Sequence, residues 1–396
     1  MISLLPTEAW EYSFLDIIRA ITAAYRSTKD VQRLYIKDIG SCIPVRSGRV
    51  GIMLSLQTLK LKKGAGVGVP LYCCPVVFKA IKMSGMRPVF LDIDASNYCI
   101  DIQDLSKKLY KIDALIAVHM FGNMCDMNTI LDVIKDKPVI EDCAQSLGSR
   151  LNGKSSGSFG SISMFSFRSG KYLTAGEGGA LYSANEDLCS QIEKLVGIMP
   201  KPSVQKECMH VIETYIRTKL RSQPLWGLLG HKLWAFYNKK VEFLSKSPIS
   251  PGQIFSSDLK IINNRTNRLQ LMIDRQRSNA EYFLKEVILP PEMFCYQPPN
   301  CYYNRFMFPI KFRSVEECTF VSDFLLKKKI STSRPYRDVI EGAAKHYDYE
   351  GDCPRAERLL NTTLVIPLHY KLRNKDLEHI AESLNLAWES VGYCSN

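Results

Sequence analysis

Lys171 stands in the stretch FSFRSGKYLTAGEGGAL, between small residues and a Gly-Glu-Gly-Gly turn. A lysine that bonds an aldehyde as a Schiff base must be held in place and partly desolvated, because only its neutral amine reacts. Small neighbours leave room for a flat cofactor. A lysine among glycines is by itself more often an exposed turn residue, so this stretch needs support from other residues.

Asp142 is the second candidate, at the end of the apolar stretch VIED. Carboxylates at the C-terminal ends of parallel strands lie where α/β proteins bind ligands. An aspartate there can hold a protonated pyridine nitrogen, which keeps the ring an electron sink. The plainer interpretation is an N-cap for a following helix.

Taken together, the two stretches favour chemistry over turns and caps. Asp142 and Lys171 each follow a predicted strand, and Ser166 stands five positions before Lys171, near enough to reach a phosphate. Lysine for an aldehyde, aspartate for a ring nitrogen and serine for a phosphate are the groups that pyridoxal phosphate (PLP) requires. We therefore predict PLP as cofactor, with Lys171 and Asp142 as the catalytic pair.

The elements that must position these residues alternate between strand and helix patterns from Gly66 to Ala184. Such alternation predicts parallel crossovers and a buried, mostly parallel sheet. We expect strands at Val67–Tyr72, Pro88–Ile93, Ala114–His119, Val139–Glu141 and Ile162–Phe167, and helices at Val76–Met86, Ile102–Tyr110 and Met127–Lys135. Asp101 and Asp126 are the expected N-caps of two of these helices.

A different pattern follows this α/β region. Residues 195–251 form an apolar and basic insertion, and a long helix is predicted over Leu259–Val287. Shorter strands and helices then alternate, with expected elements at Phe306–Phe312, Val315–Lys329 and Asn374–Leu386. We predict a large α/β cofactor domain at residues 1–260 and a smaller α+β domain at residues 261–396, entered by the long helix.

The composition of the chain limits the cellular compartments and partners that we expect. The 396 residues are 46% hydrophobic with a net charge of +12, and their 13 cysteines form no recurring metal-type pair. We expect reduced thiols, no metal site and a cytoplasmic protein. The positive charge favours anionic partners. Nucleic acid is not among them, because no basic helix with interleaved aromatic residues and no reading motif is present.

These stretches resemble the DegT/DnrJ/EryC1/StrS family of PLP-dependent sugar aminotransferases. The most specific part of the resemblance is Glu141–Gln145 followed by Ser166, Lys171 and the turn at 176–179. It also includes Val69–Tyr72, Gly85–Phe90, Asp92–Asp94, His119–Gly122 and Ile366–His369. The resemblance implies an aspartate-aminotransferase-like fold of type I and a homodimer.

The resemblance also implies roles for single residues. Lys171 would bond the cofactor, Asp142 would hold the ring nitrogen, Gln145 would lie near the phenolic oxygen and Ser166 would bind phosphate. The phosphate loop would be Gly48, Arg49 and Val50, where the family usually has Gly-Thr-Ala. Its backbone amides remain while the threonine hydroxyl is missing, and Arg49 could supply charge instead.

Other departures indicate a divergent member. Cys74 stands where the family usually has an aromatic ring over the cofactor. The family's Asn-Tyr-Arg-Met segment is replaced by SPISPGQIFSSDL, and residues 195–251 are longer and more apolar than usual.

The leading hypothesis is transamination from an amino acid, with glutamate as the expected donor, to a keto group on a nucleotide-linked sugar. PLP-dependent sugar dehydration is an alternative, although it is associated with histidine in place of Lys171. A non-catalytic regulator or scaffold is another, although it would need neither Lys171 nor Asp142. His119, Arg334, Tyr336 and His346 are candidates for substrate contact only.

The segment PLWGLLGHKLWAFYNKK at residues 224–240 combines apolar bulk with basic residues. That composition is typical of an interfacial helix on an anionic membrane. The favoured interpretation is that the segment packs on its own domain or on a dimer partner and buries Trp226 and Trp234, because large apolar residues are most often core.

Overall fold

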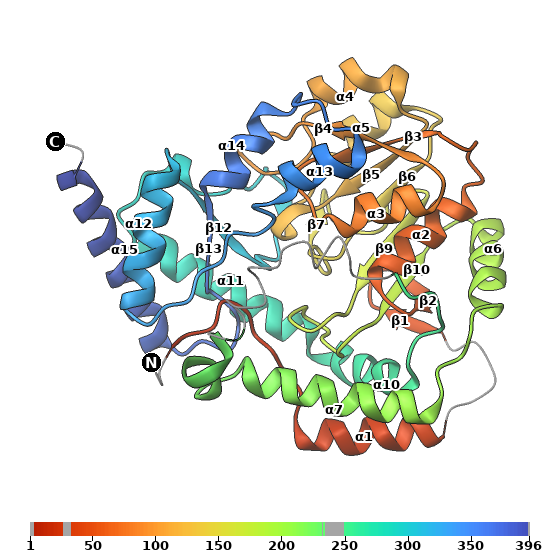
Figure 1. The fold of residues 1–396 in the computed structure, drawn as a ribbon, viewed down its shortest axis with the longest axis horizontal. Helices are drawn as coiled ribbons and strands as arrows, with labels where there is room; N and C mark the ends of the chain where they lie inside the picture. Colours follow the sequence, from red (N-terminus) through yellow and green to blue (C-terminus); the bar gives the residue numbers. More distant parts are fainter. Residues whose placement is uncertain (1–3, 27–32, 232, 234–248, 395–396) are drawn as a thin grey trace.

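The computed structural model describes residues 4–26, 33–231, 233 and 249–394 (Figure 1). Its larger part contains an eight-stranded sheet of order β1-β2-β10-β9-β6-β5-β3-β4. The strands are β1 (Leu34–Ile36), β2 (Gly40–Val45), β3 (Gly66–Pro70), β4 (Arg87–Leu91), β5 (Ala114–Val118), β6 (Val139–Asp142), β9 (Ile162–Ser166) and β10 (Gly179–Tyr182). Strands β4, β3, β5, β6 and β9 run parallel, and β10, β2 and β1 join antiparallel, which confirms the predicted α/β class.

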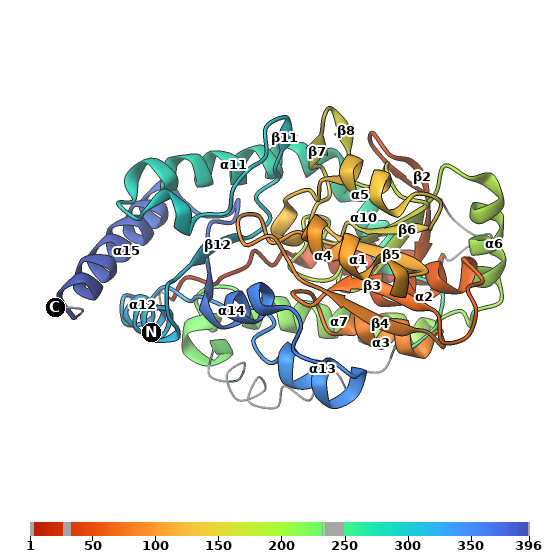
Figure 2. The same ribbon diagram turned by 90° about the horizontal axis from the view of Figure 1, so that it is seen from above.

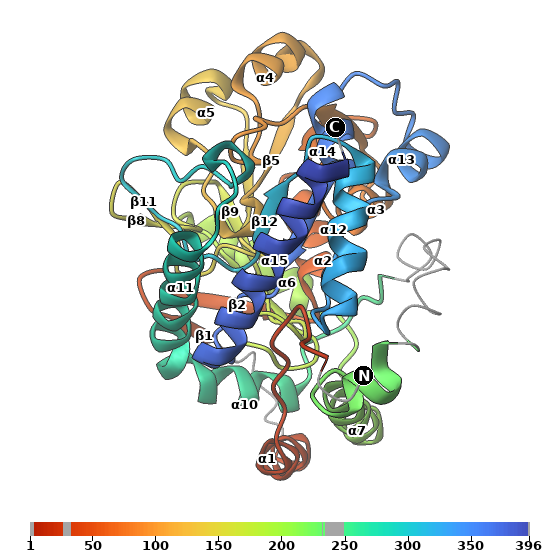
Figure 3. The ribbon, with the colours of Figure 1, turned by 90° about the vertical axis from the view of Figure 1, so that its left-hand side faces the viewer.

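Helices cover both faces of this sheet, as right-handed crossovers require (Figure 3). One face carries α2 (Gly48–Thr58), α3 (Val76–Met83) and α6 (Glu186–Gly197), and the other carries α4 (Ile102–Lys108) and α5 (Met127–Ile134). The predicted caps are confirmed. The Asp101 carboxylate accepts from the Asp104 amide at 2.8 Å, and that of Asp126 accepts from the Thr129 amide at 3.2 Å.

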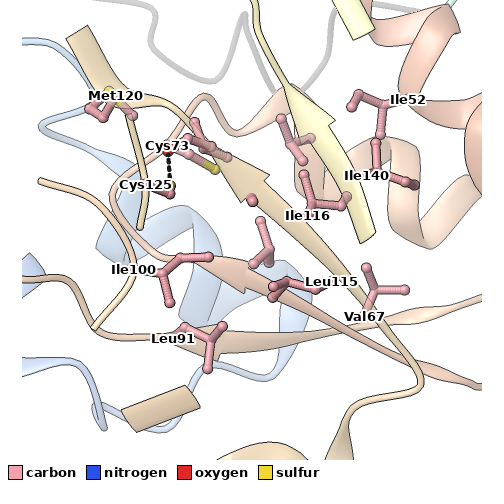
Figure 4. Close-up of a cluster of buried hydrophobic side chains, with 14 of the residues drawn as sticks. Ile52, Val67, Cys73, Leu91, Ile100, Leu115, Ile116, Met120, Cys125 and Ile140 are labelled. Atoms are coloured by element: carbon pink, nitrogen blue, oxygen red, sulfur yellow. Dashed lines mark hydrogen bonds between the residues drawn. The ribbon is translucent and has the colours of Figure 1, made fainter. Parts of the chain in front are cut away.

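A continuous apolar core lies between the sheet and its helices (Figure 4). Ile116 and Ile140 on neighbouring parallel strands are fully buried, and Ile52 of α2 packs in the same cluster. Strands buried on both faces consist of nearly continuous apolar residues, which is why the sequence pattern located them well.

The smaller part is built on the antiparallel pair β12 (Phe308–Lys311) and β13 (Thr363–Ile366), with α12 (Val315–Lys327) and α15 (Asn374–Cys394) packed together. It has its own apolar cluster, which includes Phe283, Val321 and Leu384. The remaining elements there are α13 (Val339–Tyr347), α14 (Pro354–Thr362) and β11 (Cys301–Tyr302), the last pairing with β7 (Arg150–Leu151), which pairs with β8 (Lys154–Ser155). The domain boundary at residue 260 stays a prediction.

The single long helix predicted over Leu259–Val287 is wrong. The chain forms α10 (Ser256–Arg265), a 3₁₀ turn (Thr266–Arg268) and α11 (Leu269–Glu286). Arg265 is buried, and its guanidinium donates to Asp16 at 2.9 Å and to the Thr174 carbonyl. Because these charge-assisted bonds hold Arg265 against the large domain, the backbone tightens there instead of continuing as one straight helix.

Two helices border the molecule along its lower edge in Figure 1. They are α1 (Phe14–Tyr25), which packs on α10, and α7 (Val204–Leu220), which packs on α1 and leads to a π-helical turn (Trp226–Gly230). Trp226 is buried, as expected for packing on its own domain. Lys232, Trp234, Phe236, Lys239 and Lys240 lie outside the described residues. Among the described residues, no helix has the length and low charge that crossing a bilayer would require.

Candidate active site

The residues singled out by the sequence gather at one edge of the sheet. Cys74, His119 and Asp142 follow or end β3, β5 and β6, and Lys171 follows β9. These four strands are parallel, so their C-terminal ends meet at the same edge. Strand order also reverses at β3, which has β4 on one side and β5 on the other (Figure 2). Ligands in open α/β sheets bind at such a reversal.

Lys171 is held in a tight turn after β9. Its amide donates to the Arg168 carbonyl at 3.0 Å, and the amide of Gly170 donates to Thr174 Oγ1 at 3.1 Å. Gly170 has a φ of +91°, and a Cβ added there would lie 2.6 Å from Glu8 Oε2, so the turn requires glycine. The Lys171 ammonium lies 4.4 Å from the centre of the Phe306 ring.

Burial, with help from the Arg168 charge, lowers the pKa of Lys171 to about 8, while Asp142 and Glu8 act in the opposite direction. A lysine with this pKa carries much more neutral amine near neutral pH than an exposed one. The turn therefore supplies the fixed, partly desolvated amine that bond formation to an aldehyde needs.

Asp142 is buried, and its carboxylate accepts from the Ala144 amide at 3.0 Å. Burial raises its pKa, and the Ala144 amide and the charge of Lys171 lower it only in part. The residues after it form turns, so Asp142 is not the N-cap of a helix. A buried carboxylate of this kind is stabilised by a cationic partner, and a protonated ring nitrogen would be one.

Glu141 has a structural role instead. It accepts from the amides of Gly157, Phe159 and Gly160 at 2.9, 2.6 and 2.6 Å, and His119 Nε2 donates to it at 3.0 Å. His119 Nδ1 accepts from the Cys125 amide, so both ring nitrogens are bonded. His119 and Glu141 also lie close to Cys143, but their atoms already bond one another and the backbone. His119, a candidate for substrate contact, is fully buried in this network.

The start of α2 lies close to the end of β9, where the expected phosphate-binding residues are. Ser47 caps α2, where the Val50 amide donates to its hydroxyl at 3.4 Å. A Cβ added to Gly48 would lie 3.3 Å from Ser166 Oγ, so only glycine lets the helix approach that hydroxyl. The amides of this first turn have no intrahelical acceptor and attract anions. The structure thus brings Gly48 and Ser166 together as the sequence predicted, with Arg49 half-buried and Val50 buried in the same turn.

Gln145 and Cys74 lie on other sides of the site. The side-chain oxygen Oε1 of Gln145 accepts from the Phe121 amide at 3.1 Å, and Nε2 of the same side chain donates to the Tyr336 hydroxyl at 3.3 Å. Cys74 is half-buried, and burial raises the pKa of its thiol, on which Arg168, Asp142 and Lys171 also act. Tyr336 therefore joins the site, whereas Arg334 donates to Thr319 and His346 is exposed on α13.

Sequence reasoning missed the residues that approach Lys171 from distant parts of the chain. A cavity beside Lys171 is lined by Glu8 of the N-terminal segment, by Gln276 of α11, by Phe306 and by Tyr370. Trp10 Nε1 donates to Glu8 at 3.1 Å and so holds that carboxylate. No local sequence pattern connects Glu8 with Lys171, so only the tertiary structure identifies Glu8 as a neighbour of Lys171.

Known proteins resemble this chain in sequence over the region that contains these residues. Residues 32–211 match the model of the DegT/DnrJ/EryC1/StrS aminotransferase family. The matched region makes up less than half of the chain. It contains every residue of the expected cofactor site, from Gly48 to Lys171.

Individual proteins resemble the chain in part or in fold. The chain is 37% identical to GDP-perosamine synthase of Escherichia coli O157:H7 over 147 residues. This aligned stretch is 36% of the present chain and 40% of the relative. The chain is 32% identical to the L-glutamine:2-deoxy-scyllo-inosose aminotransferase of Streptomyces kanamyceticus over 187 residues. This aligned stretch is 44% of the present chain and 43% of the relative. The chain thus matches about two fifths of the length of these relatives. The solved sugar aminotransferase CalS13 from Micromonospora echinospora has a TM-score of 0.73 at 19% identity over 98% of this chain and 100% of its own, which shows the type I fold.

Proposed function

We propose that this chain is a PLP-dependent aminotransferase that moves an amino group from an amino acid to a keto group on a nucleotide-linked sugar. The observation that carries the proposal is the pairing of Lys171 and Asp142 at one sheet edge, inside the region that matches the family. A scaffold would need neither the depressed lysine pKa nor a buried, reactive carboxylate.

The fit of the chain to the cofactor rests on three groups. Lys171 Nζ would bond the aldehyde, Asp142 would face the ring nitrogen, and Ser166 with the first turn of α2 would hold the phosphate. When bound, PLP withdraws electrons from the substrate carbon as its proton leaves.

The residues of the chain then carry out the proton transfers. With PLP bound, the neutral Lys171 amine would take a proton from the substrate carbon and deliver it to the former aldehyde carbon of the cofactor, because its pKa of about 8 lies near the working pH. Asp142 would hold the proton on the ring nitrogen, and its burial would strengthen that ion pair. The charge of Arg168, which is exposed and acts on Lys171, would offer an anionic substrate group a partner.

For the substrates we propose glutamate as donor and a nucleotide-linked keto sugar as acceptor. The names of the relatives support this class, since one concerns a GDP-linked sugar. A second relative is named for glutamine and a cyclitol ketone, so an amino acid of this type and a cyclic ketone are the features in common.

We further propose a cytoplasmic homodimer that contacts a membrane surface weakly. Leu228, Leu229 and Leu233, in the described part of the segment 224–240, are 45%, 56% and 45% exposed. Apolar side chains at that exposure are available to a partner or to lipid.

Borohydride reduction tests the central claim. We expect the purified protein to be yellow, and reduction followed by peptide mapping to find the cofactor on the peptide that contains Lys171. The matched control is Lys171→Ala, which should take up the cofactor without a reducible bond. Label on another lysine, or a colourless protein that gains no colour with added PLP, would disprove the assignment.

A further inference from the structure

A second cavity lies next to the one beside Lys171. It has a volume of about 240 Å³ and is bordered by the N-terminal segment, the residues after α7 and the residues after β13. Glu8, Ala9 and His369 line both cavities, so the two spaces adjoin. We call the second space the His369 cavity. Pockets for whole drug-sized ligands measure roughly 300–1,000 Å³, so this cavity suits one part of a larger substrate.

His369 is buried at this cavity, and one of its two ring nitrogens is unused. His369 Nε2 lies 3.2 Å from the carbonyl oxygen of Pro6, and because a carbonyl only accepts, Nε2 carries the hydrogen. The backbone carbonyl of His369 accepts from Asn279 Nδ2 at 3.0 Å, which helps to hold the residue in place. Its Nδ1 has no hydrogen-bond partner within the described part of the chain.

The unused nitrogen of His369 requires a hydrogen-bond donor. Burial lowers the pKa of His369 to about 4, so the ring is neutral at neutral pH and Nδ1 can only accept. The large majority of buried side-chain polar atoms in proteins are hydrogen-bonded, so an unused acceptor at a cavity indicates a ligand that donates there. A hydroxyl can donate, whereas a carboxylate or an ionised phosphate oxygen cannot.

Two cations also line the His369 cavity. The guanidinium carbon of Arg221 lies 4.7 and 5.1 Å from the ring centres of Trp10 and Trp226, and these contacts hold it in place. Burial lowers the pKa of Arg221 to about 10, so the group stays charged at neutral pH. Lys371 Nζ donates to the Trp10 carbonyl at 2.9 Å. Because arginine and lysine each have several N–H donors, such contacts leave others for the oxygens of an anion.

The other charges around the cavity are largely paired. Arg373 donates to the Asp376 carboxylate through two nitrogens, at 2.9 and 3.0 Å, so these two side chains neutralise each other. The Glu8 carboxylate accepts from Trp10 Nε1 at 3.1 Å. The lining as a whole has three cations and two carboxylates, which leaves it with an excess of positive charge.

The two requirements together indicate the chemistry of the ligand. Glutamate would satisfy the cations, but its carboxylates cannot donate to His369 Nδ1 and its amine must reach Lys171. A sugar phosphate satisfies both requirements, because its hydroxyls donate and its phosphate oxygens accept from arginine and lysine.

We propose that the His369 cavity receives the hexose and the adjoining phosphate of the acceptor, with a sugar hydroxyl donating to His369 Nδ1 and the phosphate on Arg221 and Lys371. Because the cavity adjoins the one beside Lys171, a sugar bound there lies next to the lysine. The inference rests on the proposed function for the reaction itself. It assigns a binding role to Arg221, which belongs to the atypical insertion at residues 195–251.

Calorimetric titration of the PLP-loaded full chain tests the proposal. The probes are α-D-glucose 1-phosphate, α-D-mannose 1-phosphate and inorganic phosphate, and the loaded cofactor keeps them out of its own phosphate site. We expect at least one sugar phosphate to bind about tenfold more tightly than inorganic phosphate. His369→Gln keeps a donor for the Pro6 carbonyl but has no acceptor at the Nδ1 position, so it should abolish most of this difference. Arg221→Gln should weaken the binding of both kinds of probe by about tenfold.

The matched control is His379→Gln, because His379 Nε2 also donates to a backbone carbonyl, that of Lys328 at 2.8 Å. This variant should bind the probes as the unaltered chain does. Equal affinity of the His369→Gln and His379→Gln variants for the sugar phosphates would overturn the proposal, and so would phosphate binding that Arg221→Gln leaves unchanged.

The titration uses the chain as it assembles in solution. A cavity filled by a second copy would therefore show as no binding of any probe, which would also overturn the proposal. Borohydride trapping on Lys171 in the same samples distinguishes a failure of this inference from a failure of the proposed function, since trapping does not depend on His369 or Arg221.

Discussion

Glu141 and Asp142 are consecutive carboxylates at the end of β6, and their surroundings differ. Successive side chains of a strand point to opposite faces of its sheet. Glu141 meets three backbone amides and His119, which lower its pKa although burial opposes them. Asp142 meets one amide and the charge of Lys171, and burial keeps its pKa raised. One carboxylate is saturated by the fold, while the other remains available to a cationic ligand.

This contrast shows that the hydrogen-bond donors around a buried carboxylate distinguish a catalytic role from a structural one. Position in the strand and residue type do not separate the two, because both residues are acidic, buried and next to each other. The predictions below test whether removing each charge affects catalysis or stability.

Asp142→Asn should produce the largest change. We expect the rate of the half-reaction with glutamate to fall by about a thousandfold, because a neutral amide cannot hold the proton on the ring nitrogen. Thermal unfolding should stay close to that of the unaltered protein, since only one backbone bond to the carboxylate is affected. An unchanged half-reaction rate would mean that Asp142 has no role in the chemistry.

Glu141→Gln should affect stability instead. The substitution weakens the bonds to the amides of residues 157–160 and to His119, and we expect a loss of about 3 kcal/mol in the free energy of unfolding. Urea unfolding followed by circular dichroism measures this loss. The contrast with Asp142 would break down if the variant were as stable as the parent and lost its turnover per folded molecule.

The smallest expected effects concern the charges around Lys171. In the cofactor-free protein, the labelling of Lys171 by an amine reagent should rise with pH through about 8, since only the deprotonated amine reacts. Arg168→Gln removes a charge that lowers this pKa and should move the midpoint to higher pH. Glu8→Gln removes a charge that raises it and should move the midpoint to lower pH. Shifts in the same direction would contradict the arrangement of the two charges.

The sequence was most informative where a candidate catalytic or cofactor-binding residue stands at the end of a strand or after it. The buried parallel strands have continuous apolar residues, so the positions of Asp142, Ser166 and Lys171 at their ends could be predicted. The chemical roles remain predictions, because they followed from the family resemblance and from the residue types. Glu141 could not be separated from Asp142, because its partners at residues 157–160 are brought to it only by tertiary folding.

The other differences also have tertiary causes. The break between α10 and α11 depends on Arg265 reaching Asp16, which lies far away in the sequence. Helix α7, for which the sequence analysis gave no bounds, is likewise held by distant residues, because Asp258 pairs with its His210 and the Ser257 amide donates to its Glu207.

The N-terminal segment that carries Glu8 has one more consequence. Leu5 bonds with the backbone of Lys329 and Ser331 and packs in the apolar cluster of the smaller part, while Tyr12 packs in a cluster of the larger part. Pro6 accepts from His369 between them. A single short stretch of chain therefore packs in two apolar clusters, and the unfolding of either cluster breaks its contacts with this stretch. The cooperativity of the whole molecule depends in part on residues 4–12, since they couple the unfolding of one core to that of the other.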